Sequence, residues 1–184
     1  SNTQSKEKEM SNCLQQASAI LQFKLESQMI ARRPEFMMEH RDVLRFINYK
    51  EKTILLNNKE YSLVDFNAPT VNPDSPSMLT DEEDKLVKTM ISMFQSSEKL
   101  QRHIRFILKK GQIYLKYNNN LLIHGCIPLE KNGDFKTFKI DNKNYSGKKL
   151  FDFFNDAVRK SFLDPNSYND LETDLLWYLW AGEC

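Results

Sequence analysis

Residues 114–128 read YLKYNNNLLIHGCIP, and the interpretation of the whole chain starts from this stretch. Two apolar runs lie on either side of three consecutive asparagines, which tolerate the positive φ angles of a tight turn. The pattern predicts an antiparallel strand pair whose second strand is buried and ends at His124. Gly125 then permits a sharp turn, so such a strand can deliver an imidazole to a metal ion or a substrate. From the residues alone, both a structural role and a ligating or catalytic role stay open for His124.

The elements that precede this strand pair are mostly helical. Apolar residues three and four positions apart predict helices over residues 5–32 and 34–49. The predicted apolar stripe of the first helix consists of Met10, Leu14, Ala17, Leu21 and Leu25. A β-hairpin is expected over residues 52–64, because two apolar runs flank Asn57 and Asn58.

A long helix is predicted between the hairpin and the strand pair. Thr80 and Glu83 have the spacing of a capping box, which marks the start of a helix. The two serines at positions 96 and 97 indicate a break, and Gly111 indicates the end. The sequence also predicts a strand over residues 135–140, followed by helices over residues 147–163 and 170–180.

These elements predict an α+β fold that is predominantly helical and contains β-hairpins. The predicted organisation is a helical segment with a β-hairpin over residues 1–66, a proline-containing loop over residues 67–79, and a third segment over residues 80–184. The third segment holds the long helix, the strand pair ending at His124 and the C-terminal helices. It finishes on an aromatic, apolar stretch, so we expect further polypeptide to follow it.

The composition limits the classes of function. A length of 184 residues fits one ordinary domain, and a formal net charge of +1 argues against a nucleic-acid-binding protein. No apolar run is long enough to cross a membrane. The three distant cysteines, Cys13, Cys126 and Cys184, form no disulfide framework, which indicates a reducing, cytoplasmic location. Only five glycines occur, fewer than is typical of an enzyme with tight phosphate- or metal-binding loops.

A second group of candidate residues is basic and recurs at helical spacing within the predicted long helix. It consists of Lys99, Arg102, Arg105, Lys109 and Lys110. One interpretation is a solvated helix face, and the other is a docking face for an anionic substrate group or an acidic partner. Both interpretations are compatible with the spacing.

Several stretches together resemble the Firmicute-type (class III) fructose-1,6-bisphosphatases, which are similar to the calcineurin-like metallophosphatases. The stretches are residues 22–27, 32–34, 97–100, 109–111, 114–128 and 177–180. They follow one another in the same order from about residue 14 to residue 183. The resemblance implies that His124 ligates one of two metal ions, that Gly125 is structural beside it, and that the ions are Mn²⁺. It also implies hydrolysis of fructose 1,6-bisphosphate to fructose 6-phosphate and phosphate in gluconeogenesis.

The remaining metal-binding motifs of that family are missing from this sequence. They are Asp-x-His-Gly, Gly-Asp-x-x-Asp-Arg-Gly and Gly-Asn-His-Asp/Glu, which precede this region in the family, and a late Gly-His-Thr. The resemblance therefore implies an internal fragment: a piece of an α/β metallophosphatase sandwich plus a helical insertion. Its partners would be the sugar bisphosphate and the rest of the parent chain, with a homo-oligomer left open. We expect the fragment alone to be inactive, because most metal ligands lie outside it.

Two other classes of function stay open at this stage. The chain could be a helical interaction domain, or a regulatory domain that senses a phosphorylated metabolite. Calorimetric titration with phosphoenolpyruvate or AMP separates them, because heat of binding is expected only from the regulatory domain.

Overall fold

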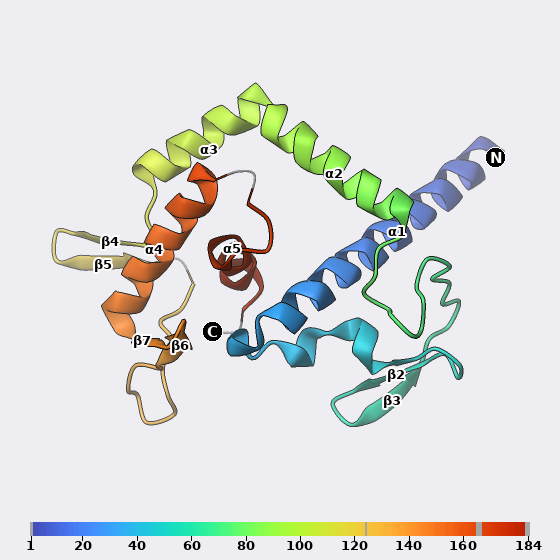
Figure 1. The fold of residues 1–184 in the computed structure, drawn as a ribbon, viewed down its shortest axis with the longest axis horizontal. Helices are drawn as coiled ribbons and strands as arrows, with labels where there is room; N and C mark the ends of the chain where they lie inside the picture. Colours follow the sequence, from blue (N-terminus) through green and yellow to red (C-terminus); the bar gives the residue numbers. More distant parts are fainter. Residues whose placement is uncertain (1, 124, 165–166, 183–184) are drawn as a thin grey trace. The chain divides into compact units, whose positions relative to one another are not determined.

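The computed structural model describes residues 2–123, 125–164 and 167–182 (Figure 1). Its contacts divide the chain into two compact units, Ser1–Thr89 and Met90–Cys184. Helices predominate, and the strands form one three-stranded and two two-stranded antiparallel sheets within the described ranges. The predicted α+β class with hairpins is thus confirmed, whereas the α/β metallophosphatase sandwich with a helical insertion stays a prediction. None of the helices in the described part is long and apolar enough to cross a membrane.

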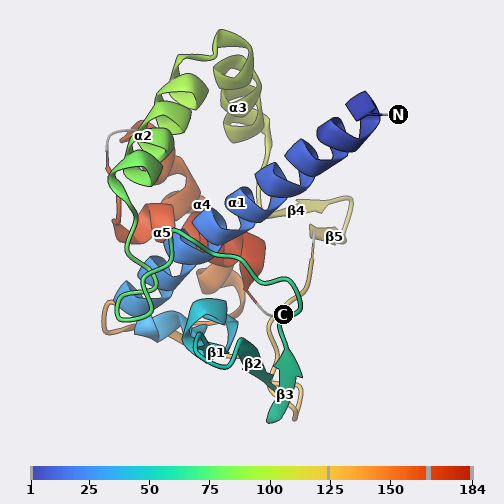
Figure 2. The ribbon, with the colours of Figure 1, turned by 90° about the vertical axis from the view of Figure 1, so that its right-hand side faces the viewer.

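The first unit is built on the helix α1 (Asn2–Arg32). Figure 2 shows its N-terminal half extending away from the sheet of its unit, and residues 6–18 are all exposed. The predicted apolar stripe is wrong in this half, because the side chains of Met10 and Leu14 are 63% and 61% exposed. The buried face of α1 instead contains Ile20, Lys24 and Ile30. Burial follows the segments that pack against the C-terminal half of α1, and not the periodicity of the sequence.

The helix predicted over residues 34–49 is replaced by three short 3-10 turns, Pro34–Phe36, Glu39–Arg41 and Val43–Phe46. Met37 adopts a left-handed conformation with a φ of 54°, which stops a regular helix at that point. The turns still bury Phe36, Met38 and Leu44. The apolar residues therefore reach the core through turns that pack on α1.

A three-stranded antiparallel sheet follows the turns. It consists of β1 (Ile47–Asn48), β2 (Thr53–Leu56) and β3 (Lys59–Ser62). The predicted hairpin is confirmed, with Leu56 opposite Lys59 in the register. Its two turn residues, Asn57 and Asn58, have φ angles of 49° and 61°. Positive φ at both positions is the signature of a two-residue hairpin turn that matches the twist of the strands.

The predicted long helix and its break are confirmed as α2 (Asp81–Ser96) and α3 (Glu98–Lys110). The capping box is present, since the backbone N–H of Glu83 donates to Thr80 Oγ1 at 3.2 Å and that of Thr80 donates to Glu83 Oε2 at 2.8 Å. Ser97 caps α3 by accepting from the N–H of Leu100. Gly111 ends α3 in an extended conformation, with its N–H donating to the carbonyl of Ile107 at 2.5 Å.

Besides α3, the second unit contains two hairpins and two further helices within the described ranges (Figure 1). Its remaining elements are β4 (Tyr114–Tyr117), β5 (Asn120–Ile123), β6 (Phe138–Ile140), β7 (Lys143–Tyr145), α4 (Gly147–Leu163) and α5 (Leu171–Ala181). The core lies where α4 packs on α5 and on the β6–β7 hairpin, and it includes Leu150, Phe154 and Leu175. The ring of Phe154 lies 6.3 Å from that of Tyr178, which joins the two helices through an aromatic contact.

Candidate functional site

The end of strand β5 is the part of the chain that the sequence marks as a metal-binding position. In the β4–β5 hairpin Tyr114 lies opposite Ile123, the last residue of β5. The hydroxyl of Tyr114 donates to Asp152 Oδ1 on α4 at 2.8 Å, and its ring lies 6.0 Å from that of Phe151. The N–H of Ile113 donates to Asn155 Oδ1 at 2.9 Å. Helix α4 therefore positions the open end of the hairpin, to which His124 is attached.

His124 itself lies outside the described residues, so its role as a metal ligand stays a prediction. Gly125 has a φ of 96°, in the left-handed region that favours glycine. A Cβ at this position would meet no atom within 4 Å, so the backbone angle and not lack of space requires glycine here. The described residues contain no group of three or more His, Cys, Asp or Glu side chains that could hold a metal ion. Their donor set alone does not make a complete metal site.

Strand β5 is not buried as predicted. Leu121 and Leu122 are 55% and 53% exposed, and Leu115 on β4 is also exposed. A strand that is apolar on both faces is typical of the interior of a sheet. The hydrogen bonds that join the hairpin to α4 lie at its open end, and a two-stranded sheet cannot cover its own faces.

Two charged side chains on α4 support the contact between α4 and the β4–β5 hairpin. Lys148 Nζ lies 2.5 Å from Asp152 Oδ2. Hydrogen bonds from Lys148 and Tyr114 hold the pKa of Asp152 below its usual value, and the bond to Asp152 raises the pKa of Lys148. Asp152 therefore stays ionised and remains an acceptor for the Tyr114 hydroxyl.

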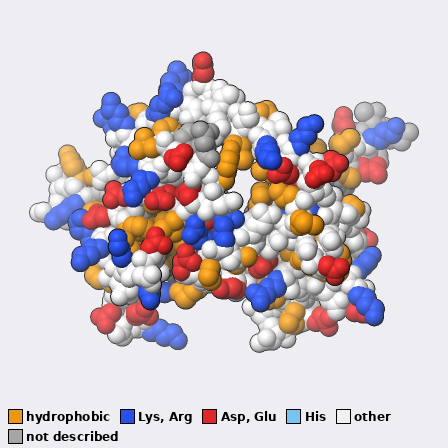
Figure 3. Space-filling view, in the orientation of Figure 1, with side chains coloured by type: hydrophobic (Ala, Val, Ile, Leu, Met, Phe, Trp, Pro, Cys, Tyr) orange, Lys and Arg blue, Asp and Glu red, His pale blue; other side chains and the backbone are white. Residues whose placement is uncertain are grey.

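The five candidate basic residues all lie on α3 and are all exposed. Figure 3 shows Lys and Arg side chains over the position of α3, at the upper left of the view. The end of the helix is fixed by Arg159 of α4, whose Nη1 donates to the carbonyl of Leu108 and whose Nη2 donates to that of Gly111 at 3.3 Å. A guanidinium on these carbonyls also offsets the partial negative charge of a helix C-terminus. The basic face thus belongs to a helix whose C-terminal end is held by Arg159 of α4.

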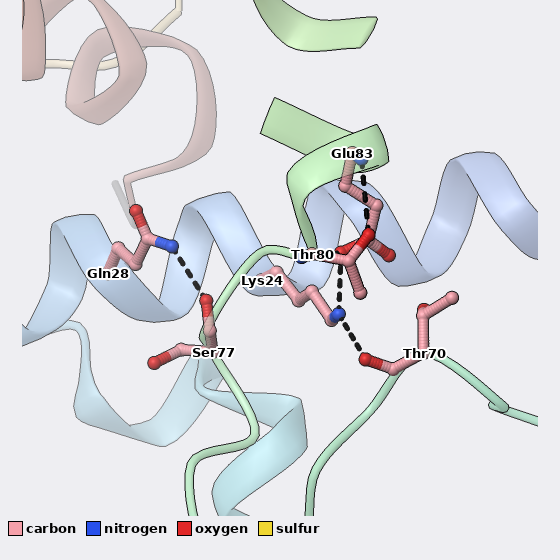
Figure 4. Close-up of polar contacts among 6 residues, drawn as sticks. All are labelled: Lys24, Gln28, Thr70, Ser77, Thr80 and Glu83. Carbon is pink, nitrogen blue, oxygen red and sulfur yellow. Dashed lines mark hydrogen bonds and ion pairs between the residues drawn. The ribbon is translucent and has the colours of Figure 1, made fainter. Parts of the chain in front are cut away.

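A buried ammonium in the first unit was not found from the sequence (Figure 4). Lys24 of α1 is fully buried, and its Nζ donates to the carbonyl of Thr70 at 2.6 Å and to Glu83 Oε2 at 2.7 Å. The same carboxylate oxygen accepts from the N–H of Thr80. One turn further along α1, Gln28 Nε2 donates to the carbonyl of Ser77 at 2.6 Å. Two α1 side chains thus fix both the 67–79 loop and the start of α2.

The charge state of Glu83 follows from these contacts. Partial burial alone would raise its pKa, but the hydrogen bonds from Lys24, Thr70 and Thr80 and the charge of Lys24 outweigh it and lower the pKa. The carboxylate therefore stays ionised opposite the ammonium. The sequence offers one weak signal for this pair, namely a lysine at position 24 that lies four residues after the apolar Ile20 and so on the same face of the helix.

The structure describes an α+β chain, and comparison with known proteins assigns its family. The chain belongs to the Firmicute fructose-1,6-bisphosphatase family, whose sequence profile matches residues 1–184. It is 56% identical over 178 residues to the class 3 fructose-1,6-bisphosphatase of Lactococcus lactis subsp. lactis strain IL1403, covering 97% of this chain and 28% of that protein.

Other relatives match the chain with a similar identity and a similar coverage. The class 3 fructose-1,6-bisphosphatase of Streptococcus agalactiae strain A909 is 48% identical over 177 residues, which cover 96% of this chain and 28% of that protein. The class 3 fructose-1,6-bisphosphatase of Staphylococcus aureus strain Newman is 48% identical over 170 residues, which cover 92% of this chain and 26% of that protein. The chain thus spans little more than a quarter of the length of these relatives. No solved structure matches it.

Proposed function

We propose that the longer protein represented by this chain is a fructose-1,6-bisphosphatase, a phosphoric monoester hydrolase. It would remove the 1-phosphate of fructose 1,6-bisphosphate, as a cytoplasmic enzyme of gluconeogenesis. The observation that supports this most is the match of the family profile to residues 1–184, together with relatives of that name along almost the whole chain. These 184 residues would supply one part of such an enzyme.

The chain's own contribution to the metal site would be His124. A neutral imidazole nitrogen suits Mn²⁺, and the resemblance stated above places a metal ligand at this position. Two bound Mn²⁺ ions would supply an activated water and neutralise charge on the phosphoryl group. The β4–β5 hairpin and its contacts with α4 hold the strand end that carries the imidazole. Gly125 would let the chain turn away directly after it.

The test uses the full-length protein and replaces one histidine at a time. His124→Ala is expected to remove most Mn²⁺-dependent release of phosphate and to lower the bound manganese measured by elemental analysis. His40→Ala is the matched control, since His40 lies in a 3-10 turn of the first unit. Full activity and full manganese content in His124→Ala would contradict the assignment of the ligand.

The isolated 184-residue chain is expected to show no turnover with added Mn²⁺, because one imidazole does not hold the ion usefully. Folding is checked in the same sample by circular dichroism. Turnover that His124→Ala abolishes would show that the chain holds a complete site, which would contradict the proposed partial contribution.

A further inference from the structure

Helix α3 carries an apolar and basic surface that is exposed in its own unit. We define the outer face of α3 as Lys99, Arg102, His103, Phe106, Ile107, Lys109 and Lys110, which recur at three- and four-residue spacing. Phe106 and Ile107 are 66% and 62% exposed. Together with Arg102 and His103 they line an open, apolar depression of about 510 Å³.

The opposite side of α3 is less exposed than the outer face. Leu100, Ile104 and Leu108 lie one helical turn apart and are half-buried, whereas no residue of α3 is fully buried. Phe106 lies on the other side, among the cations. A phenylalanine in the middle of a basic face is not needed for solubility or for helix formation. Its exposure therefore indicates a contact that is made outside its own unit.

The cations of α3 are also free to bind a partner. Lys99, Arg102, Arg105, Lys109 and Lys110 have no side-chain hydrogen bond or ion pair with any residue in the described ranges. The 13-residue helix holds five cations and one carboxylate, Glu98, in a chain whose formal net charge is only +1. An acidic surface is the complement of such a face.

We propose that the outer face of α3 is a docking surface for an acidic segment with apolar anchor residues, supplied by the longer polypeptide of the same protein. Phe106 and Ile107 would receive the apolar anchors, and the surrounding lysines and arginines would pair with the carboxylates. The packed aromatic ring would provide most of the specificity, and the charges would set orientation and salt dependence.

The spacing of the charges favours a polypeptide over a small anion. Lys99 and Lys110 are eleven residues apart, or about 16 Å along the helix axis. A phosphate group needs donors that converge within hydrogen-bond distance of one point. Cations spread along a helix, with an apolar strip between them, fit a segment that runs beside the helix.

The length of the relatives identifies the source of that segment. This chain covers 28% of the Lactococcus lactis relative, so most of the polypeptide of such a protein lies outside these residues. This proposal and the proposed function both rest on the chain being part of a longer protein. The docking surface, however, does not depend on which reaction that protein catalyses. A readout that does not use catalysis can therefore test it.

The test is zero-length cross-linking of the full-length protein with a carbodiimide, followed by mass spectrometry. The reagent joins a lysine amine to a carboxylate in contact with it as an amide and takes up the released water as a urea. We expect amides between Lys99, Lys109 or Lys110 and carboxylates outside residues 1–184. Their yield should fall at least about fivefold in 1 M salt, because exposed charge pairs are screened.

Two variants separate the docking contact from non-specific charge. Phe106→Ala and Arg102→Glu should each lower the yield of these amides several-fold. Lys131→Glu, in an exposed loop of the same unit, should leave it unchanged. Acetylation by a soluble reagent should also be at least about fivefold slower at Lys109 and Lys110 than at Lys131.

Three results would overturn the proposal. The first is acetylation of Lys109 and Lys110 as fast as that of Lys131. The second is amides that join α3 only to residues 1–184 of a second copy, with a yield that rises with protein concentration. The third is protection that appears only when inorganic phosphate or a nucleotide is added, which would identify a small-anion site. None of these results depends on whether the protein hydrolyses fructose 1,6-bisphosphate.

Discussion

The ammonium of Lys24 is buried between a backbone carbonyl and a carboxylate. Its burial determines how much the free energy of unfolding falls when the lysine is replaced. Lys24→Met should lower the free energy of unfolding by about 3 kcal/mol, because it removes the ammonium that pairs with Glu83 and that donates to the carbonyl of Thr70. Urea unfolding followed by circular dichroism measures the change.

The chain offers a matched control for this prediction. Lys88 pairs with Asp84 at 2.5 Å, but both side chains are exposed. Lys88→Met should therefore cost less than about 0.5 kcal/mol, since exposed ion pairs contribute little. Equal losses in Lys24→Met and Lys88→Met would contradict the role assigned to burial.

The same pair predicts a dependence of stability on pH. Because the contacts with Lys24, Thr70 and Thr80 lower the pKa of Glu83 below 4.5, the unfolded state binds this proton more tightly than the folded state. The contribution of Glu83 is therefore complete above about pH 4.5 and is lost as the pH falls through the folded-state pKa. The difference in free energy of unfolding between the wild type and Glu83→Gln should therefore become smaller as the pH falls. A difference that grows on acidification would show the opposite sign of the shift.

Gly111 is required by a close approach at the end of α3. A Cβ built on it lies 2.6 Å from the carbonyl oxygen of Ile107, which is too close for any side chain. Gly111→Ala should lower the free energy of unfolding by about 1–3 kcal/mol. Lys110→Ala, at the exposed neighbouring position, should cost less than about 0.5 kcal/mol. Thermal unfolding of the two variants compares them directly.

At the scale of single elements, the β4–β5 hairpin depends on its anchor to α4. Tyr114→Phe removes the hydrogen bond to Asp152, and Asn155→Ala removes the acceptor for the N–H of Ile113. Amide exchange over residues 114–123 should be several-fold faster in both variants, because local opening becomes easier. Exchange in β2–β3 is the internal reference and should not change. Unchanged exchange over residues 114–123 would show that the hairpin is held in another way.

Elements whose signals are local could be predicted from the sequence. The turn at Asn57 and Asn58, the capping box of Thr80 and Glu83, and the helix end at Gly111 each depend on a few neighbouring residues, and each is confirmed. The β6–β7 hairpin was only half predicted. Its signal was the Asp141-Asn142 pair, whose φ angles of 47° and 60° make the same kind of turn.

Features that depend on distant contacts were predicted less well. The buried face of α1 and the 3-10 turns after Pro34 follow from packing between segments, which periodicity does not record. The exposure of β5 likewise departs from its apolar pattern, which is typical of a strand that is covered on both faces. For the site, the sequence marked His124 and the basic residues of α3 but not Lys24. A buried lysine is recognised only when its carboxylate and carbonyl partners are placed around it.

At the scale of the whole chain, apolar surface remains exposed on several elements. Leu115 and Leu122 face outward on one side of the β4–β5 hairpin, as cross-strand partners in the register. The isolated 184-residue chain should therefore self-associate at micromolar concentrations through this hairpin. Leu122→Lys should reduce association in analytical ultracentrifugation, whereas Leu163→Lys, at an exposed site on α4, should not. A monomeric wild-type chain would contradict this prediction.

The two-residue turns of the β2–β3, β4–β5 and β6–β7 hairpins also have a consequence for the order of folding. Their strands are adjacent in sequence, so pairing needs only short loops and is fast, on the order of microseconds. The contacts of Lys24 with Thr70 and Glu83 join residues 46 and 59 positions apart, so a long loop must close first. We expect the hairpins to form early and the ammonium to be enclosed after the main kinetic barrier. In stopped-flow experiments, Lys24→Met should then accelerate unfolding and leave the refolding rate nearly unchanged.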